Sequence, residues 1–208
     1  AIIGLSPGIC SGILKRSNNK LIYQIPNACD LGLFKYSSIE KKFPVKYLDI
    51  NLKKRKKILI AAFAGAHGKA NGLDAILYAA KKVISLGRKD IHFVFIGDGS
   101  EKKSLMKIAN KEEIVNCHFL DPLPKSELSN FFRNYVDIGL MILQDIPAFY
   151  NGTSPNKFFD YISSGLPVLI NYPGWLSDLV VKNNIGMFVK PNDPISFAKS
   201  LIKLLDSP

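Results

Sequence analysis

The sequence is poor in the residues that build metal sites, disulfide frameworks and membrane spans. Its three cysteines, Cys10, Cys29 and Cys117, are odd in number and scattered, which favours a reduced, cytoplasmic chain. Its three histidines form no HxH or HxxxH pair, so we expect no metal site. No apolar run approaches the roughly 20 residues that span a bilayer, and the first residues lack the basic start of a signal peptide. The chain does not begin with methionine, so we expect a fragment of something longer.

Negative charge is also scarce. The chain has 17 acidic residues against 28 lysines and arginines, a net charge of +11. Part of the excess lies in one run, from Lys53 to Lys57. A solvated linker or strand entrance is the plain interpretation of this run, and contact with an anionic membrane surface is the alternative. No RNP-like, helix-hairpin or zinc-finger pattern accompanies the charge, so we expect no nucleic-acid partner.

The hydrophobic pattern predicts an α/β fold. From residue 57 onward, apolar segments of strand length alternate with segments whose apolar residues recur at helical spacing. Strands are expected at 58–64, 91–96, 115–120, 137–143, 167–171 and 185–189. This alternation predicts a Rossmann-like parallel sheet with helices on both faces. We expect Ser126 to cap the helix at 125–135 and Asp193 to cap the last helix.

Residues 1–56 lack this regularity. Residues 1–36 suit a connector, with a strand at 2–5, a helix opened by Ser6-Pro7-Gly8 and a strand at 21–25. Residues 37–56 are polar and basic, as in a linker or surface excursion. The predicted organisation is therefore a connector (1–36), a basic linker (37–56) and a ligand-binding domain (57–208).

The segment NGTSPNKFFDYISSGLPVL, residues 151–169, carries the main candidate site. Ser154 suits the N-cap of a helix and Pro155 its first position. The N–H groups of Asn156 and Lys157 then have no intrahelical acceptor, and the lysine adds a full positive charge, which suits a phosphate. Asp160 lies on the same helix face, one turn further on, where a carboxylate can accept the hydroxyls of a ribose. The alternative is an ordinary capped amphipathic helix.

The loop after the first strand of the sheet is GAHGK, at residues 65–69. Ligands of such sheets bind at the carboxyl ends of the strands, and Gly65 and Gly68 allow the backbone to approach a ligand closely. Lys69 adds a cation near the next helix. The loop is neither a Walker A loop nor a GxGxxG turn, so a tight strand–helix turn is the alternative.

Five segments in order carry a resemblance to a known family. IPNACDLGLF (25–34) resembles the linker motif IPNGVDxxxF of retaining glycosyltransferases with the GT-B fold, the group 1 or family 4 enzymes. The resemblance continues through GAHGKANGLDAILYAA, FVFIGDGSEKKSL and CHFLDPLPKSELSNFFRNYVDIGLM. It ends with PNKFFDYISSGLPVL, which is similar to EAMAxGxPV, and it covers residues 2–205. The forms FLDPLPK and SPNKFFDY look like the branch that builds bacterial surface polysaccharides, near the N-acetyl-L-fucosamine transferases.

The resemblance implies that this chain is the C-terminal, donor-binding half of a two-domain enzyme. The acceptor-binding domain would precede it, and Ser6-Pro7-Gly8 matches that domain's end. The implied activity is hexosyl transfer, with retention, in the synthesis of lipopolysaccharide, O-antigen or capsule. The resemblance implies a nucleotide-sugar donor, expected to be UDP-linked, and no metal or other cofactor. The acceptor would be lipid-linked or a glycan, on the inner face of the cytoplasmic membrane, and this half alone would be inactive.

The family's E-x7-E motif implies roles for the main site. Its second acid falls on Asp160, which would bind the ribose. Its first falls on Gly152, which has no carboxylate, so Gly152 and Thr153 mark only the vicinity of the donor sugar. Leu123 would lie against the base, and no catalytic residue is assigned in this chain. The pyrophosphate would contact a set of glycines, polar residues and lysines: Gly65, Gly68, Lys69, Ser154, Asn156 and Lys157.

The first loop departs from the family pattern. Asn71 stands where a lysine before glycine is common, and no arginine follows Gly65. Two other functions stay open beside glycosyl transfer. One is a non-catalytic basic domain that binds an anionic membrane or nucleic acid, and the other is a GT-B relative with different nucleotide-sugar chemistry.

Overall fold

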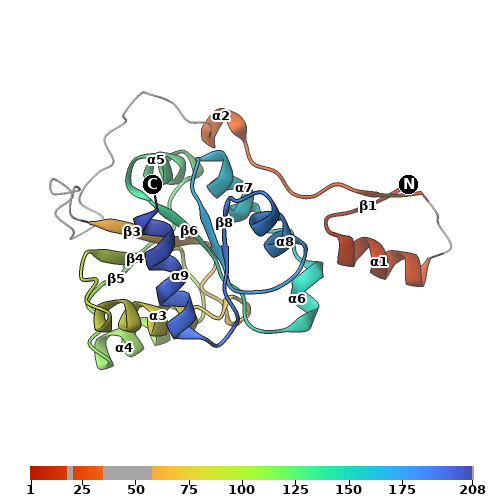
Figure 1. The fold of residues 1–208 in the computed structure, drawn as a ribbon. Helices are drawn as coiled ribbons and strands as arrows, with labels where there is room; N and C mark the ends of the chain where they lie inside the picture. Colours follow the sequence, from red (N-terminus) through yellow and green to blue (C-terminus); the bar gives the residue numbers. More distant parts are fainter. Residues whose placement is uncertain (18–20, 35–57, 208) are drawn as a thin grey trace.

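The computed structural model describes residues 1–17, 21–34 and 58–207. The predicted linker at 37–56 and the basic run from Lys53 to Lys57 lie outside these residues. An N-terminal unit is followed by a larger body (Figure 1). The unit contains β1 (Ile2–Gly4), α1 (Pro7–Arg16), β2 (Ile22–Gln24) and α2 (Leu31–Phe34). The body contains β3 (Leu59–Ala64), the 3-10 helix η3 (Lys69–Asn71), α3 (Asp74–Ser85), β4 (Ile91–Ile96), α4 (Lys102–Lys111), β5 (Cys117–Leu120), α5 (Lys125–Tyr135), β6 (Ile138–Met141), α6 (Pro147–Gly152), α7 (Asn156–Ser163), β7 (Val168–Ile170), α8 (Trp175–Lys182), β8 (Gly186–Phe188) and α9 (Pro194–Asp206).

The body is built on one parallel sheet, as predicted. Its six strands lie in the order β5-β4-β3-β6-β7-β8, and every neighbouring pair is parallel. The chain moves outward from β3 through β4 to β5 and then returns to the other side of β3 with β6. The strand order therefore reverses beside β3, and a crevice opens where the chain leaves on opposite sides.

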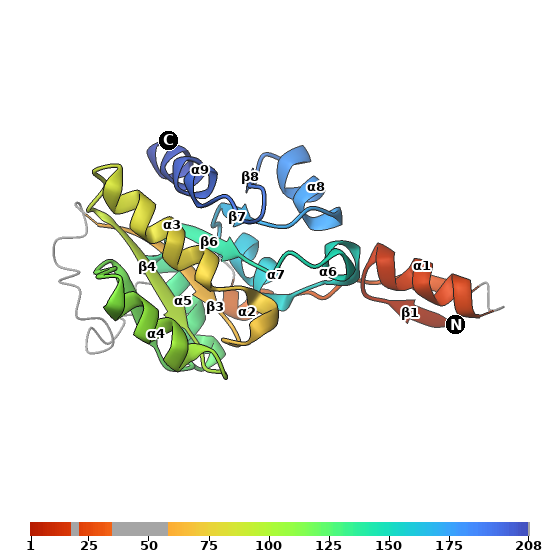
Figure 2. The same cartoon turned by 90° about the horizontal axis from the view of Figure 1, so that it is seen from below.

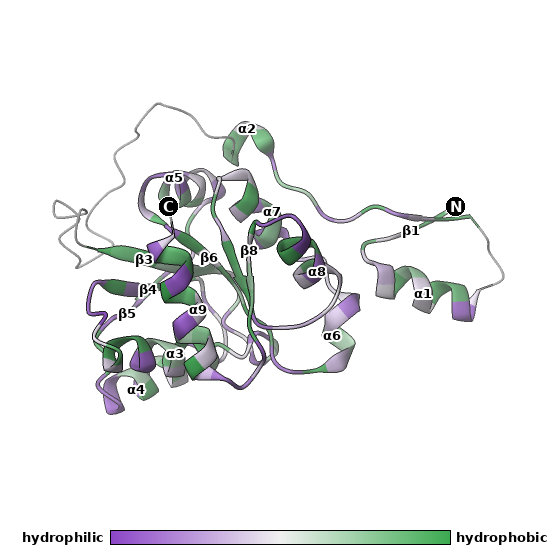
Figure 3. Ribbon diagram, viewed as in Figure 1, coloured by the Kyte–Doolittle hydropathy of each residue, from purple (hydrophilic) through white to green (hydrophobic). Residues whose placement is uncertain are grey.

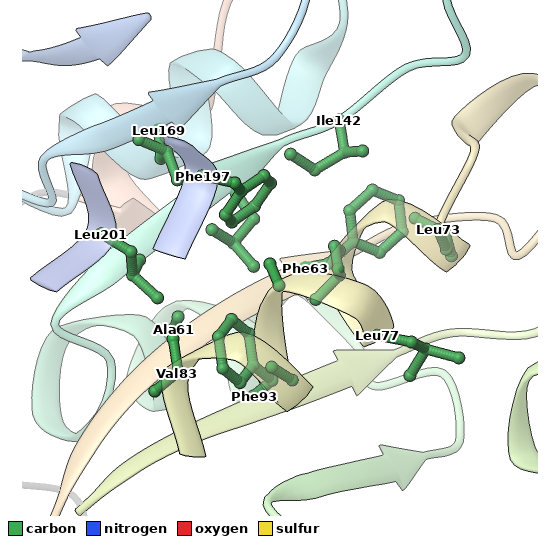
Figure 4. Close-up of a cluster of buried hydrophobic side chains, with 14 of the residues drawn as sticks. Ala61, Phe63, Leu73, Leu77, Val83, Phe93, Ile142, Leu169, Phe197 and Leu201 are labelled. Atoms are coloured by element: carbon green, nitrogen blue, oxygen red, sulfur yellow. The ribbon is translucent and has the colours of Figure 1, made fainter. Parts of the chain in front are cut away.

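Alternate residues of the strands face two separate cores. In β3, Ala62 and Ala64 belong to a core shared with α2, α5, α7 and α8, whereas Ala61 and Phe63 belong to one shared with α3, α4 and α9. Helices thus cover both faces of the sheet (Figure 2). Apolar residues mark the strands along their length (Figure 3), as expected for a sheet that is covered on both sides. Figure 4 shows the second core, where Phe63 meets residues of α3 and α9 such as Leu77 and Phe197.

Most of the N-terminal unit, namely β1, α1 and β2, projects from the body beside α6, whereas its α2 packs on α5 and α7 (Figures 1 and 2). Its two strands are parallel to each other, and Ser6 caps α1 by accepting the Ile9 N–H at 3.3 Å. A side chain on Gly8 would overlap the backbone of Asn151, so glycine permits the close approach of α1 to α6. The two strands and the helix of this unit are confirmed, but α2 was not predicted.

Several local predictions were wrong. Two helices, α6 in the segment between β6 and α7, and α8 directly after Gly174, were not predicted. Ser126 lies inside α5, whose N-cap position is Pro124 with no side-chain cap. The Asp193 cap is confirmed, because its carboxylate accepts the Ser196 N–H at 2.8 Å. Of the helices over the described residues, none is both long and apolar enough to cross a bilayer.

Candidate functional site

A cavity of about 480 Å³ opens at the carboxyl ends of β3, β4 and β5, beside the start of α7. It brings together five of the predicted site residues: Gly65, Leu123, Asn156, Lys157 and Asp160. The shared helix face that was predicted for Asn156, Lys157 and Asp160 is therefore confirmed. The other side chains of its wall were not predicted as site residues: Ala64, Ala66, Ile96, Asp98, Pro122, Lys125, Leu128 and Phe132.

Two glycines shape the floor of the cavity. Gly65 and Gly97 follow β3 and β4 with φ angles of +147° and +143°, a region that disfavours other residues. Gly65 N donates to Ile96 O at 2.9 Å, and a Cβ on Gly97 would overlap the Gly65 carbonyl oxygen. The loops after β3 and β4 therefore touch through backbone alone, which leaves the cavity above them open.

Lys157 carries its charge from α7 to the loop after β3. Its ammonium lies 3.8 Å from the centroid of the Phe63 ring and donates to Asn71 Oδ1 at 3.3 Å. A Cβ on Gly65 would lie 3.1 Å from this ammonium. Desolvation by burial lowers the pKa of Lys157 to about 7. A cation thus stands beside the first loop although that loop has no arginine of its own.

Asn71 is therefore a positioning residue for this cation. Its Nδ2 donates to Ala66 O at 2.8 Å, which fixes its Oδ1 toward Lys157. The sequence analysis noted Asn71 only as a departure from a lysine. In the structure, the Asn71 side-chain amide accepts a hydrogen bond from Lys157, which belongs to α7.

Asp160 forms the acidic wall of the cavity. Its side chain is 5% exposed, and its carboxylate accepts from Lys125 Nζ at 3.1 and 3.3 Å. Desolvation raises the pKa of Asp160, and the hydrogen bond from Lys125 opposes that rise. Lys125, at the start of α5, was missed as a site residue, and only its position after a predicted strand could have suggested it.

Tyr161 supports the crevice from behind. β3 pairs with β6 only at Ala61 and Ala62, so the strands separate before β3 ends. The buried Tyr161 hydroxyl fills the gap, accepting from Ala64 N at 3.0 Å and donating to Ala62 O at 3.2 Å. The ring packs against Gly139, where a Cβ would overlap it.

His67 lies buried behind the loop after β3. Its ring contacts Phe63, Phe95 and Phe119, with centroids 6.1 to 6.5 Å apart. Neither ring nitrogen has a hydrogen-bond partner among the described residues. Burial lowers the pKa of His67 to about 4, and nearby Lys102 adds to the effect. The imidazole is therefore neutral at pH 7 and serves as part of the packing of the loop.

Ser154 does not cap α7. The helix begins at Asn156 with Pro155 at the N-cap position, and no side chain caps it. Instead Ser154 Oγ accepts from Asn27 N at 3.0 Å, and Ser154 O accepts from Asn27 Nδ2. A partner 127 residues away has replaced the local cap. Asn27 belongs to the IPNACD segment, so Ser154 joins the connector to the body.

The remaining predicted residues do not line this cavity. Gly68 and Lys69 lie on a different hollow, beside α3 and α4. Thr153 donates to Phe149 O at 3.0 Å, and its carbonyl accepts from the Trp175 indole at 2.7 Å. Gly152 ends α6, and a Cβ there would meet no atom within 4 Å.

The geometry suits a ligand that is anionic at one end, apolar in the middle and rich in hydroxyls beside the acid. Lys157 and the first N–H groups of α7 offer the anion site. Ile96, Leu123, Leu128 and Phe132 give an apolar wall. Within the described residues, no group of three or more histidine, cysteine or acidic side chains could hold a metal ion.

The family described as "Glycosyl transferases group 1" matches residues 47–208. The chain belongs to this family. One relative, the Pseudomonas aeruginosa protein named "Probable glycosyltransferase WbjE", is 26% identical over 169 residues, which are 79% of this chain and 41% of that protein.

Two solved structures resemble the chain in fold. WaaG, described as a glycosyltransferase involved in lipopolysaccharide biosynthesis, has a TM-score of 0.73 at 16% identity, over 99% of this chain and 53% of WaaG. Anabaena HepE, solved in complex with UDP and glucose, has a TM-score of 0.70 at 13% identity, again over 99% of this chain and 53% of the other. The predicted Rossmann-like, GT-B type of fold is confirmed, and the chain spans about half the length of these relatives.

Proposed function

We propose that this chain is the donor-binding half of a glycosyltransferase and that its cavity holds the nucleoside diphosphate of a nucleotide sugar. The proposal rests chiefly on one observation: Lys157 and Asp160 lie in the same cavity, which has an apolar wall. The diphosphate would lie on Lys157 and the start of α7, and the ribose would meet Asp160. The base would contact Leu123 and its apolar neighbours.

Electrostatics would be this half's contribution to transfer. As the sugar leaves, negative charge develops on the diphosphate, and a fixed cation with free backbone N–H groups stabilises it. The Lys157 ammonium would supply the cation, and the backbone N–H groups of Asn156 and Lys157 would supply the hydrogen-bond donors. Gly65 and Gly97 keep room for the phosphates. Catalytic groups would come from the preceding domain, and we propose that no metal takes part.

The surface of the N-terminal unit supports a preceding domain. Ile3, Leu21 and Tyr23 of this unit are more than half exposed. A two-stranded parallel sheet is a poor unit by itself, because parallel sheets are normally covered on both faces. We propose that further strands continue this sheet in the intact enzyme and that they belong to the acceptor-binding domain.

The biological setting is proposed from relatives and from the motif forms. WaaG is described as acting in lipopolysaccharide biosynthesis, and HepE was solved with UDP. These names support the proposal of a UDP-linked donor and of a role in bacterial surface-polysaccharide synthesis. Hexosyl transfer with retention, to a lipid-linked or glycan acceptor, is proposed from the motif forms alone. Work at the inner face of the cytoplasmic membrane and a resemblance to N-acetyl-L-fucosamine transferases stay predictions.

Calorimetric titration of the 208-residue chain with uridine and guanosine diphosphates tests the proposal. We expect binding of at least one of them at millimolar ligand and no sugar transfer. Asp160→Ala should weaken nucleotide binding by about tenfold or more, the loss of charge-assisted hydrogen bonds, and should leave binding of inorganic pyrophosphate unchanged. Asp178→Ala, an exposed acid on α8, is the matched control. Binding of neither nucleotide, or equal losses for nucleotide and pyrophosphate, would contradict the assignment.

A further inference from the structure

Lys125 is the charged residue nearest to the acid that would bind the ribose, yet no motif assigns it a role. It begins α5, directly after the loop that follows β5. Its ammonium bridges both oxygens of Asp160, at 3.1 and 3.3 Å. The two oxygens that would receive the ribose hydroxyls therefore both accept from Lys125 in this structure.

The two members of this ion pair differ in their exposure. The Asp160 side chain is 5% exposed, whereas the Lys125 side chain is 53% exposed. A desolvated carboxylate without a partner is strongly unfavourable, so the acid depends on the lysine. On leaving, the half-exposed ammonium would regain hydration, so the cost of opening the pair falls mainly on the buried carboxylate. The pair can therefore open only when other hydrogen-bond donors take the place of the ammonium.

The ammonium that bridges Asp160 also lies over an aromatic ring. Lys125 Nζ is 5.2 Å from the ring centroid of Phe34, the last described residue of the connector. Phe34 is fully buried and packs on Phe132 of the cavity wall, with centroids 6.2 Å apart. Cation–π attraction to this ring therefore does not depend on the carboxylate, and it favours a place for the ammonium near the ring when the carboxylate oxygens bond to other donors.

We propose that Lys125 is a displaceable counterion: it keeps Asp160 charged and oriented before nucleotide binds and yields both carboxylate oxygens to the ribose hydroxyls on binding. The inference rests on the proposed function. It makes Lys125 a positioning residue for ribose recognition, acting through Asp160 and not through a contact with the nucleotide.

Other charged groups near Asp160 cannot replace this lysine. Asp98 and Lys157 line the same cavity, but the Lys157 ammonium is engaged with Asn71 and Phe63. The Tyr161 hydroxyl is committed to β3. On the connector, the exposed Asp30 accepts from Gly32 N at 2.9 Å. Without Lys125, desolvation would therefore favour the protonated form of Asp160.

The test compares uridine diphosphate with its 2′,3′-dideoxy analogue at pH 6 and pH 8. The measured quantity is the affinity for uridine diphosphate divided by the affinity for the dideoxy analogue. Both ligands carry the same base and phosphates, so protonation of Lys157 affects both affinities equally and cancels in this ratio. In the unmodified chain we expect this ratio to stay constant within about twofold. In Lys125→Met it should keep its value at pH 8 and fall by about fivefold or more at pH 6, as Asp160 takes up a proton. Lys125→Arg retains the charge and should restore the flat profile.

Two controls separate this inference from the proposed function. Lys81→Met removes another ion pair, that with Glu112 on the opposite side of the fold, and should leave the profile flat. Lys125→Gln replaces Lys125→Met if the latter does not fold. A ratio that is unchanged at both pH values, or that falls equally at both, overturns the counterion role while nucleotide binding stands. Failure of the unmodified chain to bind either nucleotide overturns the proposed function itself.

Discussion

Acidification is expected to destabilise this chain through His67. The imidazole is fully buried among Phe63, Phe95 and Phe119, and its nitrogens have no hydrogen-bond partner among the described residues. A proton on this ring would place a charge in an apolar site close to Lys102. The folded state therefore resists protonation, whereas the unfolded chain does not.

The size of the effect follows from the change in proton affinity. Burial lowers the pKa of His67 from 6.5 to about 4. Each tenfold change in proton affinity corresponds to about 1.4 kcal/mol, so the folded state loses about 3 kcal/mol relative to the unfolded state. The loss begins as the pH falls below 6.5, where the unfolded chain takes up the proton, and it is complete near pH 4, where the folded chain also takes it up.

Urea unfolding of the unmodified chain and of His67→Leu, between pH 7.5 and pH 4, measures this loss. Leucine is apolar and close in size, and it leaves no polar group unsatisfied. The free energies of unfolding of the two proteins should differ by a constant amount above pH 7. Below pH 7, the free energy of unfolding of the variant should rise, relative to that of the unmodified chain, by up to about 3 kcal/mol. Carboxylates titrate in both proteins and cancel. A difference that stays flat from pH 7.5 to pH 4 would refute the buried, neutral assignment.

Three other outcomes are expected. Because the pKa of Lys157 is about 7, binding of a nucleoside diphosphate at pH 8 should take up close to one proton. This uptake is measured as a dependence of the binding enthalpy on the buffer, and Lys157→Arg should abolish the dependence. Equal proton uptake by the variant would contradict the role of Lys157. Gly152→Glu should fold with unchanged stability within about 0.5 kcal/mol, since a Cβ there meets nothing within 4 Å; a large loss in thermal unfolding would show that the site is closed. Tyr161→Phe should cost about 1–3 kcal/mol in urea unfolding, because Ala64 N loses its buried acceptor, and a neutral result would mean that the strands close without the hydroxyl.

The sheet could be predicted from the sequence because its signals are local and repeated. The apolar runs that form β3 and β4 are each followed by a glycine and then by helical periodicity, so these local signals all predict a strand followed by a helix. The helix carrying Asn156, Lys157 and Asp160 was predicted for the same reason. Its helical face is fixed by the spacing of the residues and needs no tertiary information.

The contacts that complete the site depend on packing between distant elements. Lys125 and Asp160 are 35 residues apart, and nothing in the sequence says that the start of α5 lies against α7. The Lys157 ammonium reaches Asn71, 86 residues earlier, so a cation predicted for the helix start serves the first loop. Lys69 was predicted beside the phosphates from its sequence position alone. The 3-10 helix that follows Gly68 places it on another hollow.

The error at Ser154 explains what the connector motif does. Local rules favour a serine directly before a proline as the N-cap of a helix, and those rules are normally reliable. Here the serine hydroxyl and carbonyl are both bonded to Asn27 of the IPNACD segment. Two residues on, Cys29 Sγ lies 2.7 Å from Ser163 Oγ at the end of α7. The connector therefore grips the helix that carries Lys157 and Asp160 at both of its ends. The IPNACD segment and α7 are thus joined in one structural unit, which holds the helix of the proposed nucleotide site at both ends.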